Sequence, residues 1–242
     1  MIRDVGTIKG IYRYPVKSMQ GESLQSAALG WHGIPGDRRF AFRRLDDAGG
    51  FPWLYAGRFP GLLRYKPLTR EVDGEPVATH VVTPSGAALE LDSEELRQEL
   101  SAAFKGDVSV FRLKHGMFDE AMLSLINLAT IDEIGRRSGN DLDPRRFRPN
   151  ILVEATSSEP FQEDAWIGKA IAFGRGSDTP AMTSMLRDER CSMINFDPET
   201  AASSPEILKA AVKANTNCAG LYGATLRTGT ISVGDVVSVI DI

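Results

Sequence analysis

One cysteine of this 242-residue chain lies among charged residues that could tune its chemistry. Cys191 ends the segment Arg187-Asp188-Glu189-Arg190-Cys191. Flanking arginines favour the thiolate, whereas Asp188 and Glu189 oppose that effect. A thiolate is a soft ligand that suits a transition metal. Most free cysteines are small core residues, and this segment taken alone favours that structural interpretation.

The second cysteine has no cationic neighbours. Cys218 lies in Asn217-Cys218-Ala219-Gly220, and we interpret it as structural. Two cysteines are too few for a disulfide scaffold, a zinc site made of thiolates, or a four-cysteine iron–sulfur cluster within this chain.

Two short segments next to predicted strands carry a cation that could bind an anion. Tyr14-Pro15-Val16-Lys17-Ser18 presents an ammonium and a hydroxyl in a loop, and Gly36-Asp37-Arg38-Arg39 places an arginine at a strand start. An arginine can hold a phosphate through two hydrogen bonds, but it can equally pair with a carboxylate such as Asp37. Local sequence favours the structural interpretation of both segments.

A third segment, Arg145-Arg146-Phe147-Arg148-Pro149-Asn150, carries three arginines ahead of an apolar strand. Pro149 predicts an extended Arg148, which would turn Arg146 and Arg148 to one side and Arg145 to the other. An anion site and a surface ion-pair network are equally supported. Thr130 begins a predicted helix, whose free N–H groups can bind an anion, although a capping threonine needs no ligand.

Composition limits the classes of function. The formal net charge is −4, and acidic and basic residues are mixed without a basic run, so nucleic acid binding has little support. Residues 1–10 lack the apolar core of a signal peptide, and no apolar run is long enough to cross a membrane. We therefore expect a cytoplasmic protein with reduced thiols and no membrane partner.

The elements that must position these residues are mostly short strands. Strands are expected over residues 5–14, 24–29, 39–44, 77–83, 87–91, 108–113, 151–153, 170–173 and 182–186, with two more within 222–240. Three helices are expected: one capped by Asp92, one from Thr130 to Gly139, and one from Pro205 to Ala214. Without a βαβ rhythm, the pattern predicts an α+β fold that is predominantly β, with a closed or sandwiched sheet.

The order of these segments resembles the MOSC domain class, named for the C-terminal domain of molybdenum cofactor sulfurase. It is also similar to the class that includes the mitochondrial amidoxime-reducing component and its bacterial relatives. The resemblance covers nearly the whole chain, and its shared order is more specific than any one segment. Besides the segments around Lys17, Arg38, Arg148 and Cys191, the matching segments are Ala56-Gly57-Arg58-Phe59-Pro60, Glu163-Asp164-Ala165-Trp166-Ile167-Gly168, Asp197-Pro198-Glu199-Thr200 and Gly229-Thr230-Ile231-Ser232-Val233-Gly234-Asp235.

The resemblance implies an N-terminal β-barrel-like domain over residues 1–115 and a MOSC β-barrel domain with a few helices over residues 116–242. It implies a molybdenum cofactor (molybdopterin) held between the two, with Cys191 as both metal ligand and catalytic residue. Pyridoxal phosphate binding is a further property that the class implies. The family's cofactor-binding residues fall on Lys17, Ser18, Arg38, Thr130, Arg148 and Asn150.

The implied activity is the reduction of N-hydroxylated compounds such as amidoximes. Electrons would come from a separate ferredoxin-like or flavin reductase partner, since the chain has too few cysteines for its own cluster. One alternative is a carrier that holds the cofactor, or sulfur as a Cys191 persulfide, without turnover. Another is a β-rich binding module with Cys191 in its core. The loop Phe51-Pro52-Trp53-Leu54 departs from the family pattern, as do Met19 and Ala201, which bears on substrate specificity first.

Overall fold

The computed structural model describes residues 2–241. Its strands are β1 (Ile2–Arg13), β2 (Glu22–Leu24), β3 (Ser26–Leu29), β4 (Phe40–Arg44), β5 (Lys66–Val72), β6 (Glu75–Val82), β7 (Ala88–Glu90), β8 (Val108–Arg112), β9 (Leu123–Asn127), β10 (Ile151–Ala155), β11 (Ala170–Phe173), β12 (Ala181–Glu189), β13 (Cys218–Arg227), β14 (Gly229–Ser232) and β15 (Val236–Ile240). The α-helices of this range are α1 (Glu94–Phe104), α2 (Leu128–Ser138) and α3 (Glu206–Asn215). Short 3-10 helices are η1 (Pro60–Arg64), η2 (Pro144–Phe147), η3 (Gln162–Trp166) and η4 (Ser192–Asn195).

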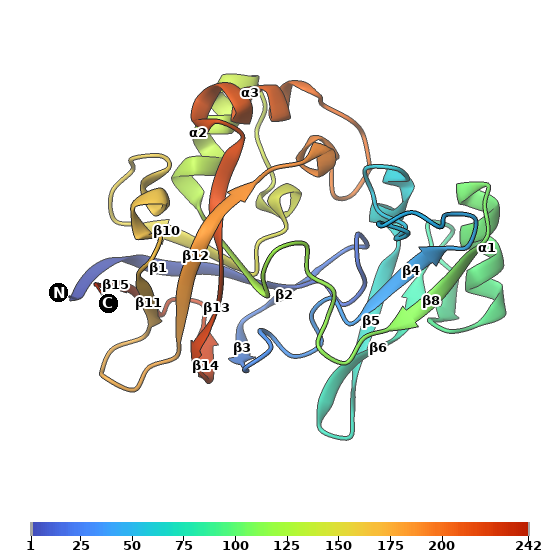
Figure 1. Ribbon diagram of the computed structural model, residues 1–242, viewed down its shortest axis with the longest axis horizontal. Helices are drawn as coiled ribbons and strands as arrows, with labels where there is room; N and C mark the ends of the chain where they lie inside the picture. The colour runs from blue at the N-terminus through green and yellow to red at the C-terminus, as the bar shows by residue number, and fades with distance from the viewer. Residues whose placement is uncertain (1, 242) are drawn as a thin grey trace.

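Seven strands close into a barrel, which confirms the predominantly β fold. Their order is β10-β9-β13-β12-β11-β15-β1, and β1 pairs again with β10, while β2 extends the sheet beyond β1. Only the short β9–β10 pair is parallel among these pairings. The barrel interior is filled by β-branched, leucine and aromatic side chains, including Ile8, Val153 and Phe173. Because β1 pairs with β15, the two chain ends lie side by side (Figure 1).

A second group of elements lies at the other end of the molecule (Figure 1). It consists of the β4–β8 pair, the β5-β6-β7 sheet and helix α1. Its own core includes Phe42, Leu54, Leu62 and Leu96. The first strand, β1, nevertheless belongs to the barrel and pairs with β10 and β15 from the C-terminal half. A domain boundary near residue 115 stays a prediction.

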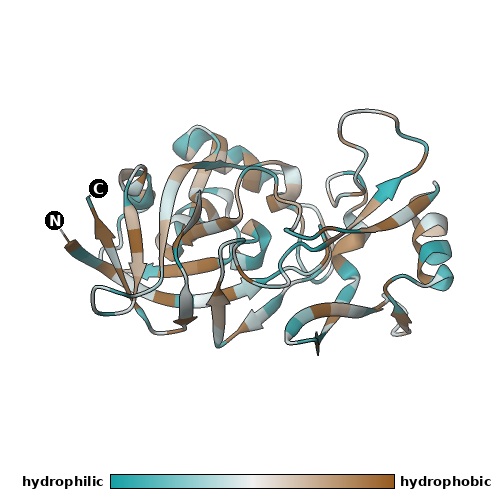
Figure 2. Ribbon diagram, turned by 60° about the horizontal axis from the view of Figure 1, so that its bottom comes forward, coloured by the Kyte–Doolittle hydropathy of each residue, from teal (hydrophilic) through white to brown (hydrophobic). Residues whose placement is uncertain are grey.

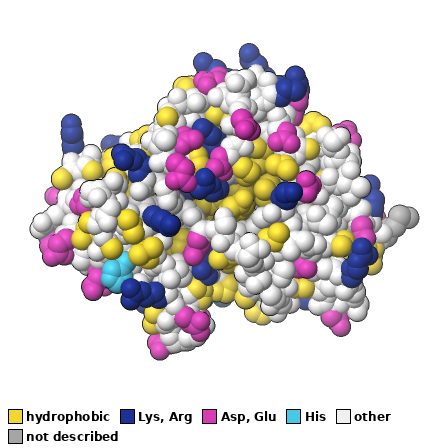
Figure 3. Space-filling model, turned by 180° about the vertical axis from the view of Figure 1, so that it is seen from behind, with side chains coloured by type: hydrophobic (Ala, Val, Ile, Leu, Met, Phe, Trp, Pro, Cys, Tyr) yellow, Lys and Arg dark blue, Asp and Glu magenta, His cyan; other side chains and the backbone are white. Residues whose placement is uncertain are grey.

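Helices α2 and α3 pack together beside the barrel on a third apolar cluster that includes Ile131, Ile134 and Ile207. Figure 2 shows hydrophobic segments mainly along strands, with hydrophilic segments in loops and on α1. On the face drawn in Figure 3, basic and acidic side chains are interspersed. Within residues 2–241, no helix is long and apolar enough to cross a bilayer.

Several local predictions are wrong in detail. Ser93, not Asp92, caps α1, because its Oγ accepts the Leu96 N–H at 3.2 Å. The single strand expected over residues 24–29 is two short strands with different partners, β1 for β2 and β14 for β3. The third helix begins after Pro205 rather than after Ser204. Gly139 does end α2, with the positive φ of 72° that favours glycine.

The backbone of Arg148 is also not extended. Asp143 and Pro144 start helix η2, and the Arg148 N–H donates to the Arg145 carbonyl at 3.1 Å. Arg148 therefore closes this turn with φ 49° and ψ 44°, in the left-handed region. Pro149 disfavours the right-handed helical conformation for the preceding residue, and the chain takes the left-handed alternative.

Candidate functional site

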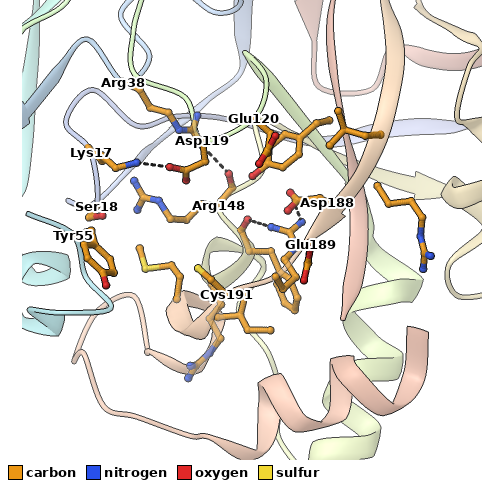
Figure 4. A pocket seen from close by; sticks show the side chains of 18 of the residues that line it. Lys17, Ser18, Arg38, Tyr55, Asp119, Glu120, Arg148, Asp188, Glu189 and Cys191 are labelled. Atoms are coloured by element: carbon orange, nitrogen blue, oxygen red, sulfur yellow. Dashed lines mark hydrogen bonds and ion pairs between the residues drawn. The ribbon is translucent and has the colours of Figure 1, made fainter. Parts of the chain in front are cut away.

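A cavity of about 630 Å³ lies where β12, η2 and η4 face loops of the N-terminal half. Five predicted site residues line it: Lys17, Ser18, Arg38, Arg148 and Cys191. In Figure 4, Lys17, Ser18 and Tyr55 lie on one side, Asp188 and Glu189 on the other, and Arg148 and Cys191 between them. The structure thus brings together residues separated by up to 174 positions (191 − 17).

Cys191 lies two residues after the end of β12 and directly before η4, and its thiol is exposed in the cavity. The interpretation of Cys191 as a buried core residue is therefore wrong. Cys218 is half-buried, with its Sγ 3.7 Å from the Thr216 carbonyl oxygen, and burial raises the pKa of its thiol. The cavity therefore holds one of the two thiols.

Arg190 supports the cavity wall rather than offering a free cation. Its guanidinium is buried and donates to the carbonyls of Ala219 at 2.7 Å and Phe147 at 2.8 Å. It also forms an ion pair with Asp188 at 2.9 Å. These bonds tie the end of β12 to β13 and η2, which fixes the backbone next to Cys191.

Asp188 is a cavity residue that the sequence analysis did not single out as a site. Its Oδ2 accepts a hydrogen bond from the Ser124 hydroxyl at 3.1 Å. Burial raises the pKa of Asp188 to about 6, and the neighbouring Arg190 acts in the opposite direction. Tyr222 also lines the cavity, and burial followed by the charge of Asp188 raises its pKa. Burial therefore favours the neutral form of the Asp188 carboxyl in this wall.

Lys17 lies in a loop after β1 and lines the cavity. The neighbouring Val16 forms a β-bridge with Phe40 of β4, which attaches this loop to the strand. The Lys17 Nζ forms an ion pair with Asp119 at 2.6 Å. Burial raises the pKa of Asp119, but Lys17 together with the charges of Arg38 and Arg148 more than offsets this effect, so the net pKa is lowered. Asp119 was missed because it comes from the connection between β8 and β9, 102 residues along the chain.

Arg38 is held by a buried network behind the cavity surface. Asp37 binds the Arg38 guanidinium, and the same carboxylate accepts the Tyr14 N–H at 2.7 Å and the Asn150 amide at 3.1 Å. Arg38 Nη2 also donates to the Arg148 carbonyl at 3.1 Å. Asn150 is buried and does not line the cavity. The contacts of Asn150 position Arg38, and its direct contact with a cofactor stays a prediction.

Arg148 forms no ion pair within residues 2–241. Its Nη1 donates to the Met19 carbonyl at 2.7 Å, and its guanidinium lies over the Tyr14 ring, 4.1 Å from the centroid. Its Nη2 is buried and has no hydrogen-bond partner within residues 2–241. Burial, with a further contribution from the charge of Arg38, lowers the pKa of Arg148 to about 10. An anion at this position would satisfy the free donor and the charge.

Arg146 also lines the cavity and Arg145 does not, which agrees with the predicted division of the three arginines. Arg146 donates to the Asn195 carbonyl and to Asp197, both at 3.1 Å. Arg145 pairs with Asp143 at 2.6 Å and with Glu199 at 2.5 Å. The segment is therefore both an ion-pair network and a cavity wall.

Thr130 does not line the cavity, and its role at a cofactor stays a prediction. Helix α2 begins after Asn127, so Thr130 lies inside its first turn. The Thr130 hydroxyl donates to Glu163 Oε2 at 2.9 Å and accepts the Phe161 N–H at 2.8 Å. Glu163 also accepts the Asn127 N–H at 3.4 Å. The residues form a buried structural contact between α2 and η3.

This contact predicts a pH dependence of stability. Burial raises the pKa of Glu163 from 4.5 to about 6. The protonated Glu163 carboxyl therefore contributes stability that is fully present below the pKa of Glu163 in the unfolded chain. This stability is lost as pH rises through 6. The Glu163→Gln variant lacks this titration. We expect the difference in unfolding free energy between wild type and variant to change by roughly 2 kcal/mol between pH 4 and pH 7.

Urea denaturation at both pH values measures that change. Glu159→Gln removes an exposed carboxylate three residues before η3 and serves as the control. Equal pH dependence in wild type and Glu163→Gln would contradict the assigned titration.

Comparisons with known proteins agree with this architecture. A family model for the MOSC N-terminal beta barrel domain matches residues 5–117, and one for the MOSC domain matches residues 112–238. The YUAD protein from Bacillus subtilis has a similar crystal structure, with 15% identity, a TM-score of 0.54, and coverage of 99% of this chain and 98% of that chain. YiiM from Geobacillus stearothermophilus is 12% identical, with a TM-score of 0.40 and coverage of 73% and 72%. No curated protein matches the chain by sequence.

Proposed function

Because the chain belongs to the MOSC domain family, which is associated with molybdenum cofactor binding, we propose that it binds this cofactor in the Cys191 cavity and catalyses a redox reaction there. The family model for the MOSC domain matches residues 112–238, from the last residue of β8 into β15, and this region contributes Cys191 and Arg148. The model for the N-terminal domain spans the region of Lys17, Ser18 and Arg38. The cavity is built from both regions.

One observation carries the proposal: an exposed thiol and a guanidinium with a buried, unpartnered Nη2 share one cavity. A thiolate matches a molybdenum centre, and the free Arg148 N–H matches the phosphate of the pterin. The available donors therefore fit the two parts of the group.

In this assignment Cys191 would hold the metal. Arg148 and Arg38 would bind the phosphate end, and Lys17 and Ser18 would add an ammonium and a hydroxyl. When bound, the cofactor supplies two-electron redox chemistry at molybdenum. The residues around it bind, orient and neutralise charge.

For the reaction we propose reduction of N-hydroxylated compounds, in which an N–OH group takes up two electrons and two protons and leaves as N–H and water. The electrons would come from a separate ferredoxin-like or flavin reductase protein, because two cysteines are too few for a four-cysteine cluster of this chain's own. Pyridoxal phosphate binding stays a prediction, for which Lys17 is the lysine in this cavity.

Turnover with a supplied reductant tests this proposal. Protein produced in a host that makes the cofactor is mixed with an amidoxime and a reduced viologen dye, and the amidine product is measured. We expect amidine formation by the wild type and none above background by Cys191→Ser. The exposed thiol also suits a sulfur carrier, so protein that holds molybdenum but forms no amidine would favour the carrier and reject the reductase.

A further inference from the structure

Phe51 and Tyr55 form an aromatic surface at the cavity, and we propose that it selects substrates with a planar aromatic body. This inference rests on the proposed redox function, because it concerns the substrate of the same cavity. Both residues lie in the connection between β4 and η1, and both line the cavity. We call residues 51–57 the aromatic loop.

The aromatic loop is held firmly against β4. The Leu54 N–H donates to the Phe42 carbonyl at 2.7 Å, and the Arg44 N–H donates to the Pro52 carbonyl at 2.8 Å. The buried Arg44 guanidinium adds a bond to the Phe51 carbonyl at 2.8 Å. Leu54 is fully buried in the core of the N-terminal half. These contacts fix the loop backbone before any ligand binds, which lowers the entropic cost of binding.

The two rings form an edge-to-face pair with centroids 5.5 Å apart and an interplanar angle of 83°. Phe51 is nonetheless 47% exposed, and the Lys17 ammonium lies 5.6 Å from its ring centroid. An exposed aromatic ring at a cavity gains stability when another apolar surface covers it. The pair therefore offers a preformed surface for stacking.

The aromatic loop also lies close to the proposed metal ligand. Gly57 of this loop packs against Ser192, the residue after Cys191. A side chain added at Gly57 would place its Cβ only 3.1 Å from the Ser192 Oγ. Figure 4 shows Tyr55 on the side of the cavity opposite Asp188 and Glu189. Apolar side chains of Met193 and Ile194 line the cavity as well. The cavity thus has a cationic part suited to a phosphate and an apolar part suited to a planar ring.

The experiment compares two amidines, benzamidine and acetamidine, which share the polar group and differ in the ring. Both are products of the proposed reaction and bind without turnover. Calorimetry on molybdenum-loaded protein measures the two dissociation constants for the wild type, Phe51→Leu and Tyr55→Leu. We expect the wild type to bind benzamidine at least about tenfold more tightly, and each leucine variant to reduce that ratio by about five- to tenfold.

The variants Phe51→Tyr and Tyr55→Phe retain an aromatic ring. If stacking causes the preference for benzamidine over acetamidine, both variants keep the wild-type ratio of dissociation constants. Trp31→Leu removes a 64% exposed aromatic side chain outside the cavity and is the matched control, with an unchanged ratio. Molybdenum content equal to wild type shows that each variant is folded and loaded. A ratio near one in the wild type, or an unchanged ratio in both leucine variants, would overturn the proposal.

The two proposals fail in different ways. Selective benzamidine binding without amidoxime reduction would reject the reductase and leave the aromatic surface in place. Amidoxime reduction without selectivity for the aromatic amidine would reject the aromatic surface alone.

Discussion

The Cys191→Ser variant is expected to bind molybdenum at least about 100-fold more weakly than the wild type. Removal of a residue that only orients a metal ligand already weakens metal binding by about 10- to 100-fold, and removal of the ligand itself should do more. Serine keeps the size of the side chain but offers a hard oxygen that stays protonated at neutral pH. Because Cys191 is exposed, the fold should be unaffected.

Elemental analysis of purified protein gives the molybdenum-to-chain ratio for wild type and variant. Cys218→Ser is the matched control, because Cys218 is half-buried outside the cavity, and it should keep the wild-type ratio. A Cys191→Ser protein with wild-type molybdenum content would contradict Cys191 as a metal ligand.

The Arg148→Met variant should lose the cofactor while becoming a more stable apoprotein. A buried cation without an anionic partner destabilises a fold, and apolar side chains that replace buried charges often add about 1–4 kcal/mol. Arg148 fits this case through its free Nη2 and its lowered pKa. The same guanidinium is the group that we assign to the phosphate, so its removal should reduce pterin content at least about tenfold.

Two measurements test whether Arg148→Met raises the stability of the apoprotein and lowers its cofactor content. Urea denaturation of cofactor-free protein gives the unfolding free energy, and fluorescence of the oxidised pterin gives the cofactor content. Arg145→Met is the control, since Arg145 pairs with Asp143 and Glu199 outside the cavity. It should cost at most about 1 kcal/mol and leave the pterin content unchanged. Wild-type pterin content in Arg148→Met would exclude Arg148 as the phosphate ligand.

Most strands could be predicted because their signals are local. The alternation of residues 39–44 and the run 170–173 correspond to β4 and β11 within one residue at each end. Predictions failed where distant contacts decide the backbone. Thr130 looks like a helix cap in sequence, but Glu163, 33 residues away, holds it inside the first turn of α2. The left-handed Arg148 is fixed by helix η2 and by the Met19 carbonyl, 129 residues away.

The candidate site was predicted in part for the same reason. Lys17, Arg38, Arg148 and Cys191 lie in short segments whose order resembles a known family, and the structure brings them together. Asp119 lies in none of these segments, and Asp188 was considered only as a charge that opposes the Cys191 thiolate, yet both line the cavity. Asn150 was predicted at the cofactor, yet its contacts show a supporting position behind Arg38.

The most direct test of the central claim is the molybdenum and pterin content of the wild-type protein, produced in a host that makes the cofactor. The arrangement of Cys191 and Arg148 in one cavity predicts about one molybdenum and one pterin per chain. Protein from such a host that contains neither would contradict cofactor binding in this cavity and, with it, the proposed reductase.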